Sequence, residues 1–225
     1  MEMPIIHFGA LNEAGNLDEW DGYEWFDGVF IGQIIEAAYP HRGRYGLRIT
    51  SYVNNRFAYV FKTGLSISIA PGESICLSFA QRFTNNPSGT VYVAKWFDDD
   101  DNLILHHDIV SSGVVRSIVR DDGGAWHSIS GQTPLADGKW HWISVGLRRA
   151  TSATAQDAQL TIHVDGVIEG TLSGLDVYDA FANFDTLRFG IPSYSRSGFV
   201  IDLDEVFISG EALEPFLAGG GRWLR

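Results

Sequence analysis

The sequence predicts an all-β fold, an antiparallel β-sandwich, on three observations. Short segments of alternating apolar residues recur along the chain, and Gly, Asn, Asp and Pro separate them. No apolar pattern of helical period runs for more than a few residues. The 225 residues are 45% hydrophobic, enough for one large core. We therefore expect one sandwich domain over residues 1–210 and a tail over residues 211–225, whose Trp223 and Leu224 would dock on this subunit or on a partner.

The most regular strand pair is expected at residues 137–147 and 160–166. The first segment starts at the turn pair Asp137-Gly138. The second ends at Asp165-Gly166, where glycine accepts the positive φ of a tight hairpin turn. Alternation places one largely apolar set on the inner face: His141, Ile143, Val145, Leu147, Leu160, Ile162 and Val164. The histidine of that set is expected to be a hydrogen-bonded core residue rather than a base.

The hairpin that follows does not fit the simplest register. With a two-residue turn, Val164 pairs with Val167, and Ile162 then lies opposite Glu169. We expect a one-residue bulge that turns Ile168 inward instead.

Charge and cysteine content exclude several classes of partner. The net charge of -12 disfavours nucleic acid and anionic membrane surfaces, which would repel the protein. Cys76, the single cysteine, lies in a strand pattern and is expected to be a small buried residue rather than a nucleophile. No apolar run is long enough to insert in a membrane. Residues 1–7 lack the basic region and apolar core of a signal peptide, so we expect synthesis in a cytoplasm without standard export. The stretch 149–159, rich in Ala, Thr and Ser, is expected to be an exposed loop.

Four motifs follow one another along the chain. They are Asn12–Trp20, Gly43–Ile49, the Gly-x-Trp-His strand at Gly138–His141 with Val164-Asp165-Gly166, and Ile201–Ile208. In this order they resemble the laminin-G-like branch of the concanavalin A-like lectin and glucanase superfamily, as found in phage and bacterial proteins. The resemblance implies a concanavalin A-like jelly roll. It also implies functions from glycan binding and adhesion to polysaccharide cleavage and virion structure, so the fold does not decide the function.

The resemblance further implies a structural calcium ion between the first and last strands, which lie side by side in many jelly rolls. Glu13, Asp202 and Asp204 would supply the hard oxygen ligands that Ca²⁺ prefers. The alternative is that Asp204 caps a turn or pairs with an arginine such as Arg188.

The acidic run Asp98–Asn102 is a second candidate for calcium. An EF-hand is excluded, because Leu103 stands where the loop needs glycine and Ile109 stands where it needs glutamate. A solvated hairpin turn is the simpler interpretation.

Catalytic patterns are missing from the sequence. Glucanases of this superfamily carry Glu-x-Asp-x-Glu, and the nearest stretch, Val200–Asp204, has valine at the nucleophile position. Alginate-lyase-like relatives need a Gln-x-His strand beside a tyrosine-bearing strand, and neither is evident. His106 and His107 are adjacent, so they face opposite sides of a strand and suit one metal poorly. There is no Gly-x-Ser-x-Gly elbow and no phosphate-cradling glycine loop. The sequence thus predicts that the protein is not an enzyme.

Aromatic side chains are the remaining candidates for function. Carbohydrate modules present flat rings to sugar faces, flanked by polar groups. Tyr92 and Trp96 are expected to share one face of a strand, and Trp126 and Tyr194 lie near predicted loops. The alternative is that the tryptophans pack in the core or between subunits.

The sequence therefore predicts a non-catalytic sandwich module. Its expected role is as a structural or adhesion protein on a phage particle, on capsid or tail, with other virion subunits or its own copies as partners and host glycans as a further partner. The alternative is an extracellular carbohydrate-binding or polysaccharide-degrading module of a bacterium.

Overall fold

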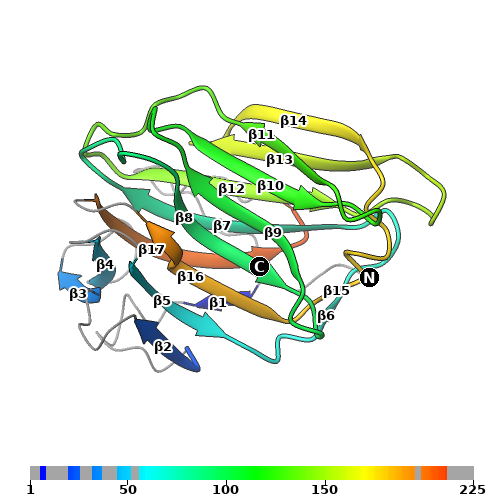
Figure 1. Cartoon of the computed structure of the whole chain (residues 1–225), viewed down its shortest axis with the longest axis horizontal. Helices are drawn as coiled ribbons and strands as arrows, with labels where there is room; N and C mark the ends of the chain where they lie inside the picture. The colour runs from blue at the N-terminus through cyan, green and yellow to red at the C-terminus, as the bar shows by residue number, and fades with distance from the viewer. Residues whose placement is uncertain are drawn as a thin grey trace, which may run out of the picture.

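The computed structural model describes residues 6–8, 20–25, 32–36, 45–51, 56–195 and 199–211. The described strands form an eight-stranded sheet, a seven-stranded sheet and a two-stranded pair, and the two large sheets stack as a sandwich (Figure 1). Neighbouring strands run antiparallel throughout, which confirms the predicted fold class. In this part of the chain, no helix has the length and apolar character needed to cross a bilayer.

The eight-stranded sheet has the order β14-β13-β12-β7-β17-β4-β3, and β1 pairs with β17. Its strands are β1 (Ile6–Phe8), β3 (Gly32–Glu36), β4 (Tyr45–Ser51), β7 (Ser74–Arg82), β12 (His141–Arg148), β13 (Ala158–Val164), β14 (Val167–Leu175) and β17 (Phe199–Ser209). β1 and β17, the first and last strands in the described part of the chain, pair with each other, as the resemblance implied.

The seven-stranded sheet has the order β11-β10-β9-β8-β16-β5-β2. Its strands are β2 (Gly22–Trp25), β5 (Arg56–Lys62), β8 (Val91–Phe97), β9 (Leu103–Ile109), β10 (Val115–Arg120), β11 (Trp126–Ser130) and β16 (Thr186–Ser195). The short pair consists of β6 (Ile67–Ser68) and β15 (Asn183–Phe184). The β8–β9, β10–β11 and β14–β15 connections gather at one end of the sandwich (Figure 1).

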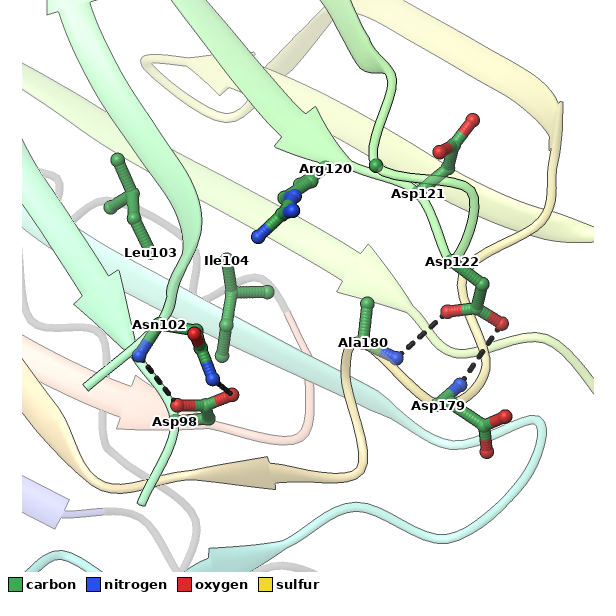
Figure 2. A pocket seen from close by; sticks show the side chains of 10 residues that line it. Asp98, Asn102, Leu103, Ile104, Arg120, Asp121, Asp122, Asp179 and Ala180 are labelled. Atoms are coloured by element: carbon green, nitrogen blue, oxygen red, sulfur yellow. Dashed lines mark hydrogen bonds between the residues drawn. The ribbon is translucent and has the colours of Figure 1, made fainter. Parts of the chain in front are cut away.

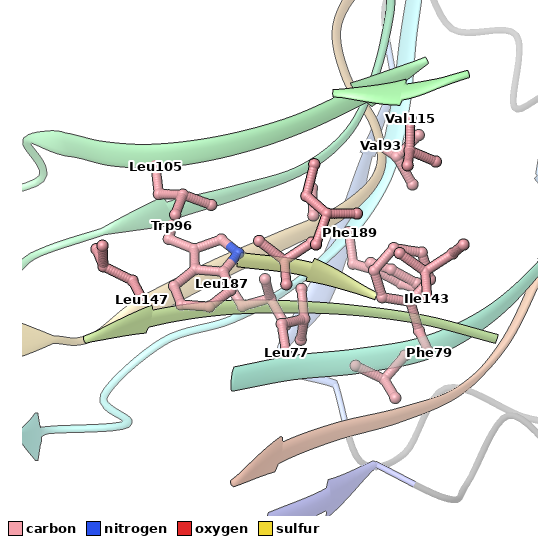
Figure 3. Packing of buried hydrophobic residues seen from close by; sticks show 14 of the residues in the cluster. Leu77, Phe79, Val93, Trp96, Leu105, Val115, Ile143, Leu147, Leu187 and Phe189 are labelled. Carbon is pink, nitrogen blue, oxygen red and sulfur yellow. The ribbon is translucent and has the colours of Figure 1, made fainter. Parts of the chain in front are cut away.

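The core fills the space between the two sheets. The predicted alternation of β7 and β12 holds, because Ile75, Leu77 and Phe79 meet Ile143 and its neighbours on the inner face. Side chains from both sheets interdigitate there (Figure 3), as shown by Leu77, Phe79, Val93, Trp96, Leu105, Val115, Ile143, Leu147, Leu187 and Phe189. Burial of these side chains is the main stabilising contribution to the fold.

The β13–β14 hairpin follows the prediction in part. Asp165 and Gly166 have φ values of 51° and 80°, as a two-residue turn requires, and Val164 pairs with Val167. The expected bulge is present, with the register shifting after Ile162. The expectation that it turns Ile168 inward is wrong, because that side chain is 61% exposed. Gly170 lies opposite Ile162 instead.

The connection between β12 and β13 differs from the expected exposed loop. Its first residues are buried, because Arg149 donates to the carbonyl oxygens of Ile69 (2.5 Å) and Tyr178 (2.7 Å). The guanidinium also lies over the Tyr178 ring. Only the later part of the loop is exposed to solvent.

Candidate functional site

The outer face of the seven-stranded sheet, which points away from the core, carries the candidate site. A bulge in β8 sets which side chains reach it: the register with β9 shifts between Tyr92 and Ala94. Ala94 and Trp96 therefore face the core, whereas Tyr92 and Lys95 face outward, where the Lys95 Nζ lies 5.0 Å from the Tyr92 ring centroid. The prediction that Tyr92 and Trp96 share a face is wrong for this reason.

Three rings from three strands form an aromatic row on this face: Tyr92 of β8, His106 of β9 and Trp126 of β11. The Tyr92 ring meets the His106 ring edge-on, with centroids 5.1 Å apart. The His106 ring stacks on Trp126 at 5.6 Å, with an interplanar angle of 25°. Trp126 is 47% exposed, so the row presents an indole to solvent. Such a flat apolar surface suits the face of a sugar ring.

His106 is neutral at physiological pH in this setting. Burial, reinforced by the positive charges of Lys95 and Arg116, lowers its pKa to about 4. Both ring nitrogens are buried without a hydrogen-bond partner among the described residues, and Nε2 lies 3.9 Å from the Asp108 carboxylate. A buried polar group of this kind usually has a partner, so the ring keeps an unused capacity to donate and accept.

Two cations flank the row. Lys95 and Arg188 are direct cross-strand partners on β8 and β16, and Lys95 is also opposite His106 on β9. Burial, and next the charge of Arg188, lower the pKa of Lys95. Arg188 lies over the Phe97 ring at 4.3 Å and 3.5 Å from a carboxylate oxygen of Asp101. Like charges placed opposite each other in a sheet are destabilising, and an anionic ligand would offset that cost.

An ion pair borders the row on the β9–β10 side. Arg116 donates twice to Asp108, at 3.0 Å and 2.7 Å, in a bidentate arrangement. Burial nevertheless raises the pKa of Asp108, against the lowering effect of the guanidinium. This pair fixes the polar edge of the site and holds Arg116 in one orientation.

The structure separates the four predicted glycan-binding residues. Trp126 and Tyr92 belong to the aromatic row, as described above. Trp96 is wrong as a sugar platform: it is 1% exposed and packs against Phe181 and Phe184 in the core. Tyr194 lies in β16, but its side chain is outside the described part of the chain.

The acidic side chains proposed for calcium have other contacts. Asp202 is buried and receives two hydrogen bonds from Arg48 and two from Arg82, at 2.5–2.9 Å. Asp204 is fully buried and accepts the backbone N–H of Glu205. Glu13 lies outside the described residues. In the described part of the chain, no three His, Cys, Asp or Glu side chains form a group that could hold a metal ion. The alternative named for Asp204 was a turn cap or a pair with an arginine such as Arg188; the arginine pairs that the structure shows are on Asp202, with Arg48 and Arg82.

Two further predictions concern isolated residues. The acidic run after β8 is the predicted hairpin turn: the Asp98 carboxylate accepts backbone N–H groups of Asp100 and Asn102. His141 is hydrogen-bonded as expected, with Nδ1 2.8 Å from Asp165 and Nε2 3.0 Å from Asp137. It joins two turns at the end of the sheet and lies away from the aromatic row.

Sequence reasoning missed His106, Lys95 and Arg188 as members of one site. The histidine pair was correctly expected to face opposite sides of a strand: His106 lies outward, and His107 is in the core against Phe79 and Ser117. The signal that could have found the site was the set of β8 residues that face outward, and the bulge at residue 93 hides this set from a simple alternation. A period-two pattern cannot reveal a bulge by itself.

Comparisons with known proteins establish the fold and leave the family open. No protein-family model matches the chain, and no curated protein matches it in sequence. An endo-β-1,4-glucuronan lyase from the fungus Trichoderma reesei shares the fold with a TM-score of 0.64 and 15% identity, over 94% of this chain and 96% of that one.

Binding domains of botulinum neurotoxins share the fold with lower TM-scores and over less than half of their own chains. The serotype D domain, solved with N-acetylneuraminic acid, has a TM-score of 0.56 and 14% identity over 85% of this chain. Another structure comes from botulinum neurotoxin type C, whose cell entry is dependent upon interaction with two ganglioside molecules. It has a TM-score of 0.57 and 15% identity over 85% of this chain. This chain spans 43% and 44% of those chains.

These findings correct the prediction that the protein is not an enzyme. A lyase has this fold along its whole length, so the fold does not separate enzymes from binding modules. The sequence argument also relied on the lack of a Gln-x-His strand beside a tyrosine-bearing strand, and Ile104 does stand where that motif needs glutamine before His106. Tyr92 and His106 do lie on adjacent strands of one face.

Proposed function

We propose that the outer face of the seven-stranded sheet binds an acidic glycan chain. The observation that carries the proposal is the direct opposition of Lys95 and Arg188 beside the aromatic row of Tyr92, His106 and Trp126. The rings offer stacking surfaces, and the cations attract carboxylate or sulfate groups. The overall charge of -12 makes this local concentration of cations selective rather than a general attraction for anions.

The dimensions of the face suit a chain that crosses the strands. Arg188, Lys95 and His106 are successive cross-strand partners on β16, β8 and β9. The sheet continues through β10 to β11, which carries Trp126. Neighbouring strands are about 4.8 Å apart, so the distance from Arg188 on β16 to Trp126 on β11 is roughly 19 Å across the sheet. Several sugar units therefore contact the site together.

The structural neighbours support this proposal without establishing it. One is named for glucuronan, and another was solved with N-acetylneuraminic acid, so two chains of this fold are associated with acidic sugars. Location on a phage particle, with virion subunits as partners, stays a prediction from the sequence.

Binding of matched polymers tests the proposal. We expect the protein to bind a polyuronate and to ignore a neutral glucan of equal length. Lys95→Gln with Arg188→Gln should abolish binding, and Trp126→Ala should weaken it about tenfold, since a ring contact contributes about 1.4 kcal/mol. Lys139→Gln, which alters an exposed lysine in the Asp137–Lys139 turn, is the matched control. Equal binding of neutral and acidic polymers would contradict the proposal.

Cleavage of the bound chain is a second candidate function, favoured by the neutral His106 beside Tyr92. With a shift of the Trp126 ring that exposes one of the buried nitrogens, the neutral imidazole would remove the proton α to a uronate carboxylate while Lys95 and Arg188 neutralise that carboxylate. The C4–O bond then breaks, a C4=C5 double bond forms, and the Tyr92 hydroxyl would give its proton to the departing oxygen. The test is the ultraviolet absorbance of the unsaturated product. Binding without any such product, at every pH from 5 to 9, would exclude this activity.

A further inference from the structure

A pocket of about 280 Å³, here named the end pocket, opens beside the aromatic row. It lies where the β8–β9 and β10–β11 turns meet the segment before β15 (Figure 2). Ten residues line it: Asp98, Asn102, Leu103, Ile104, Arg120, Asp121, Asp122, Gly124, Asp179 and Ala180. Arg120 is the cross-strand partner of Trp126, so the pocket begins where the row ends.

The turns that form the end pocket are fixed by their own hydrogen bonds. Asp98 holds Asn102 through the backbone N–H (2.7 Å) and the side-chain amide (2.9 Å). Asp122 accepts the backbone N–H groups of Tyr178, Asp179 and Ala180 at 2.7–3.2 Å. The oxygens of these two carboxylates are therefore occupied, and they shape the pocket rather than serve a ligand.

Asp121 likewise accepts the backbone N–H of Ala125 and lies 2.7 Å from His127 Nε2, so two charged groups of the pocket remain for a ligand. Figure 2 shows the Arg120 side chain reaching toward Ile104, into the space between the two turns. Among the described residues, no hydrogen bond or ion pair joins the Arg120 guanidinium or the Asp179 carboxylate to another side chain. One offers a fork of N–H donors, and the other offers only acceptors. Leu103, Ile104 and Ala180 add apolar surface to the lining.

This combination selects the chemistry of the occupant. Adjacent hydroxyl groups both donate and accept hydrogen bonds, so a sugar ring can satisfy the guanidinium and the carboxylate at once while its C–H face covers the apolar surface. The carboxylates of Asp98, Asp121, Asp122 and Asp179 disfavour an anion in the same space. A metal cation is disfavoured because, among the described residues, no three of these acidic groups are arranged to hold one, and Arg120 adds a positive charge. An uncharged ligand remains.

We propose that the end pocket is a subsite for one uncharged sugar unit at an end of the glycan chain. The inference rests on the proposed function of the outer face and names which part of the ligand lies beyond the aromatic row. Lys95 and Arg120 are separated by two strand spacings and two residues along β10, which gives roughly 12 Å. An acidic unit at Lys95 and an uncharged unit at the end pocket therefore belong to one chain, a few sugars apart.

Oligouronates that carry or lack one neutral hexose at an end test the proposal. We expect the wild-type protein to bind the hexose-bearing compound at least tenfold more tightly. Arg120→Met and Asp179→Asn should each remove that difference and leave the affinity for the plain oligouronate unchanged. Both residues are partly or fully exposed at the surface, so neither change should unfold the protein, and the melting temperature verifies this. Lys139→Met serves as the matched control.

The outcomes separate the two proposals. A hexose preference that survives both pocket variants, or no preference in the wild type, overturns the subsite and leaves the acidic-glycan function intact. A third outcome is that plain oligouronates do not bind, whereas a neutral oligosaccharide binds to the wild type and not to Arg120→Met. That result overturns the acidic-glycan function and supports the end pocket as a sugar site. If neither compound binds, both proposals are overturned.

Discussion

Lys95 and Arg188 stand directly opposite each other on the outer face of the seven-stranded sheet. Because burial and the neighbouring guanidinium both lower the pKa of Lys95, its ammonium group is held at an energetic cost in the unliganded protein. Such a cost is characteristic of sites whose residues serve a ligand rather than stability.

An acidic polymer should therefore stabilise the protein. At a free concentration of one hundred times Kd, a polyuronate should raise the free energy of unfolding by about 2.7 kcal/mol. Lys95→Gln should lose this increment. The increment should also disappear in 1 M salt, where the screening length is about 3 Å. Thermal unfolding followed by circular dichroism measures both effects, and an increment that resists high salt would argue against the electrostatic mechanism.

The hydrogen bonds of His141 to Asp165 and Asp137, here named the His141 clamp, should make stability depend on pH. Hydrogen bonding to Asp165 first, and to Asp137 next, raises the pKa of His141 despite its burial. A raised folded pKa contributes stability that is complete below about pH 6.5, the value of the unfolded histidine, and that is lost as pH rises through the folded value. The difference in unfolding free energy between the wild type and His141→Gln, measured in urea from pH 5.5 to 9, should shrink as pH rises, because the buried neutral His106 and His107 act equally in both proteins. Equal pH profiles for the two proteins would contradict the clamp.

Asp202 should be important for stability in the eight-stranded sheet. Its side chain is 5% exposed and lies between Arg48 and Arg82, which are partly exposed. Asp202→Ala leaves two guanidinium groups without their shared carboxylate, so we expect a loss of about 3 kcal/mol. The loss should be equal in calcium and in chelator, because arginine donors occupy the carboxylate. A larger loss in calcium would show that an ion binds at this residue.

Gly190 should be intolerant of any side chain. Its φ is 132°, and an added Cβ would lie 2.5 Å from the Ile49 Cδ1 atom and 2.9 Å from the Ala58 carbonyl oxygen. We expect Gly190→Ala to lower the free energy of unfolding by more than about 2 kcal/mol, combining backbone strain and overpacking. Gly64→Ala is the matched control: its φ is also positive, at 66°, but nothing lies within 4 Å. Similar losses at the two positions would assign the effect to φ alone.

Cys76 should be unreactive in the folded protein. Burial, and next the charge of Glu211, raise the pKa of its thiol to about 12. The thiolate is the reactive form, so alkylation at pH 8 should be slow in buffer and rapid in denaturing urea. Mass spectrometry of the alkylated protein measures both rates. Rapid labelling without denaturant would show that the residue is accessible.

Much of the fold followed from local patterns. The alternation of β7 and β12, the turn at Asp165-Gly166 and the burial of Cys76 are all properties of short segments. A strand with one buried face must alternate, and a tight turn must contain a residue that accepts positive φ. Such rules act within a few residues and can be recognised without knowledge of distant partners.

The candidate site depended on positions far apart in the chain. The bulge in β8 reverses the outward phase, and only the pairing with β9 reveals it, so Trp96 was placed outside and Lys95 was overlooked. Arg188 reaches Lys95 from 93 residues further along, through β16–β8 pairing. The resemblance gave Asp202 as a calcium ligand, and its arginine partners could not be foreseen because they lie on β4 and β7, remote in sequence.

The sequence alone therefore determined that this chain forms an antiparallel sandwich with a regular apolar core between two sheets. The tertiary structure decided which aromatic rings face solvent and which charges meet. The physical reason is that alternation encodes burial one residue at a time, whereas strand register and bulges, fixed by packing of the whole sandwich, bring the side chains of different strands together.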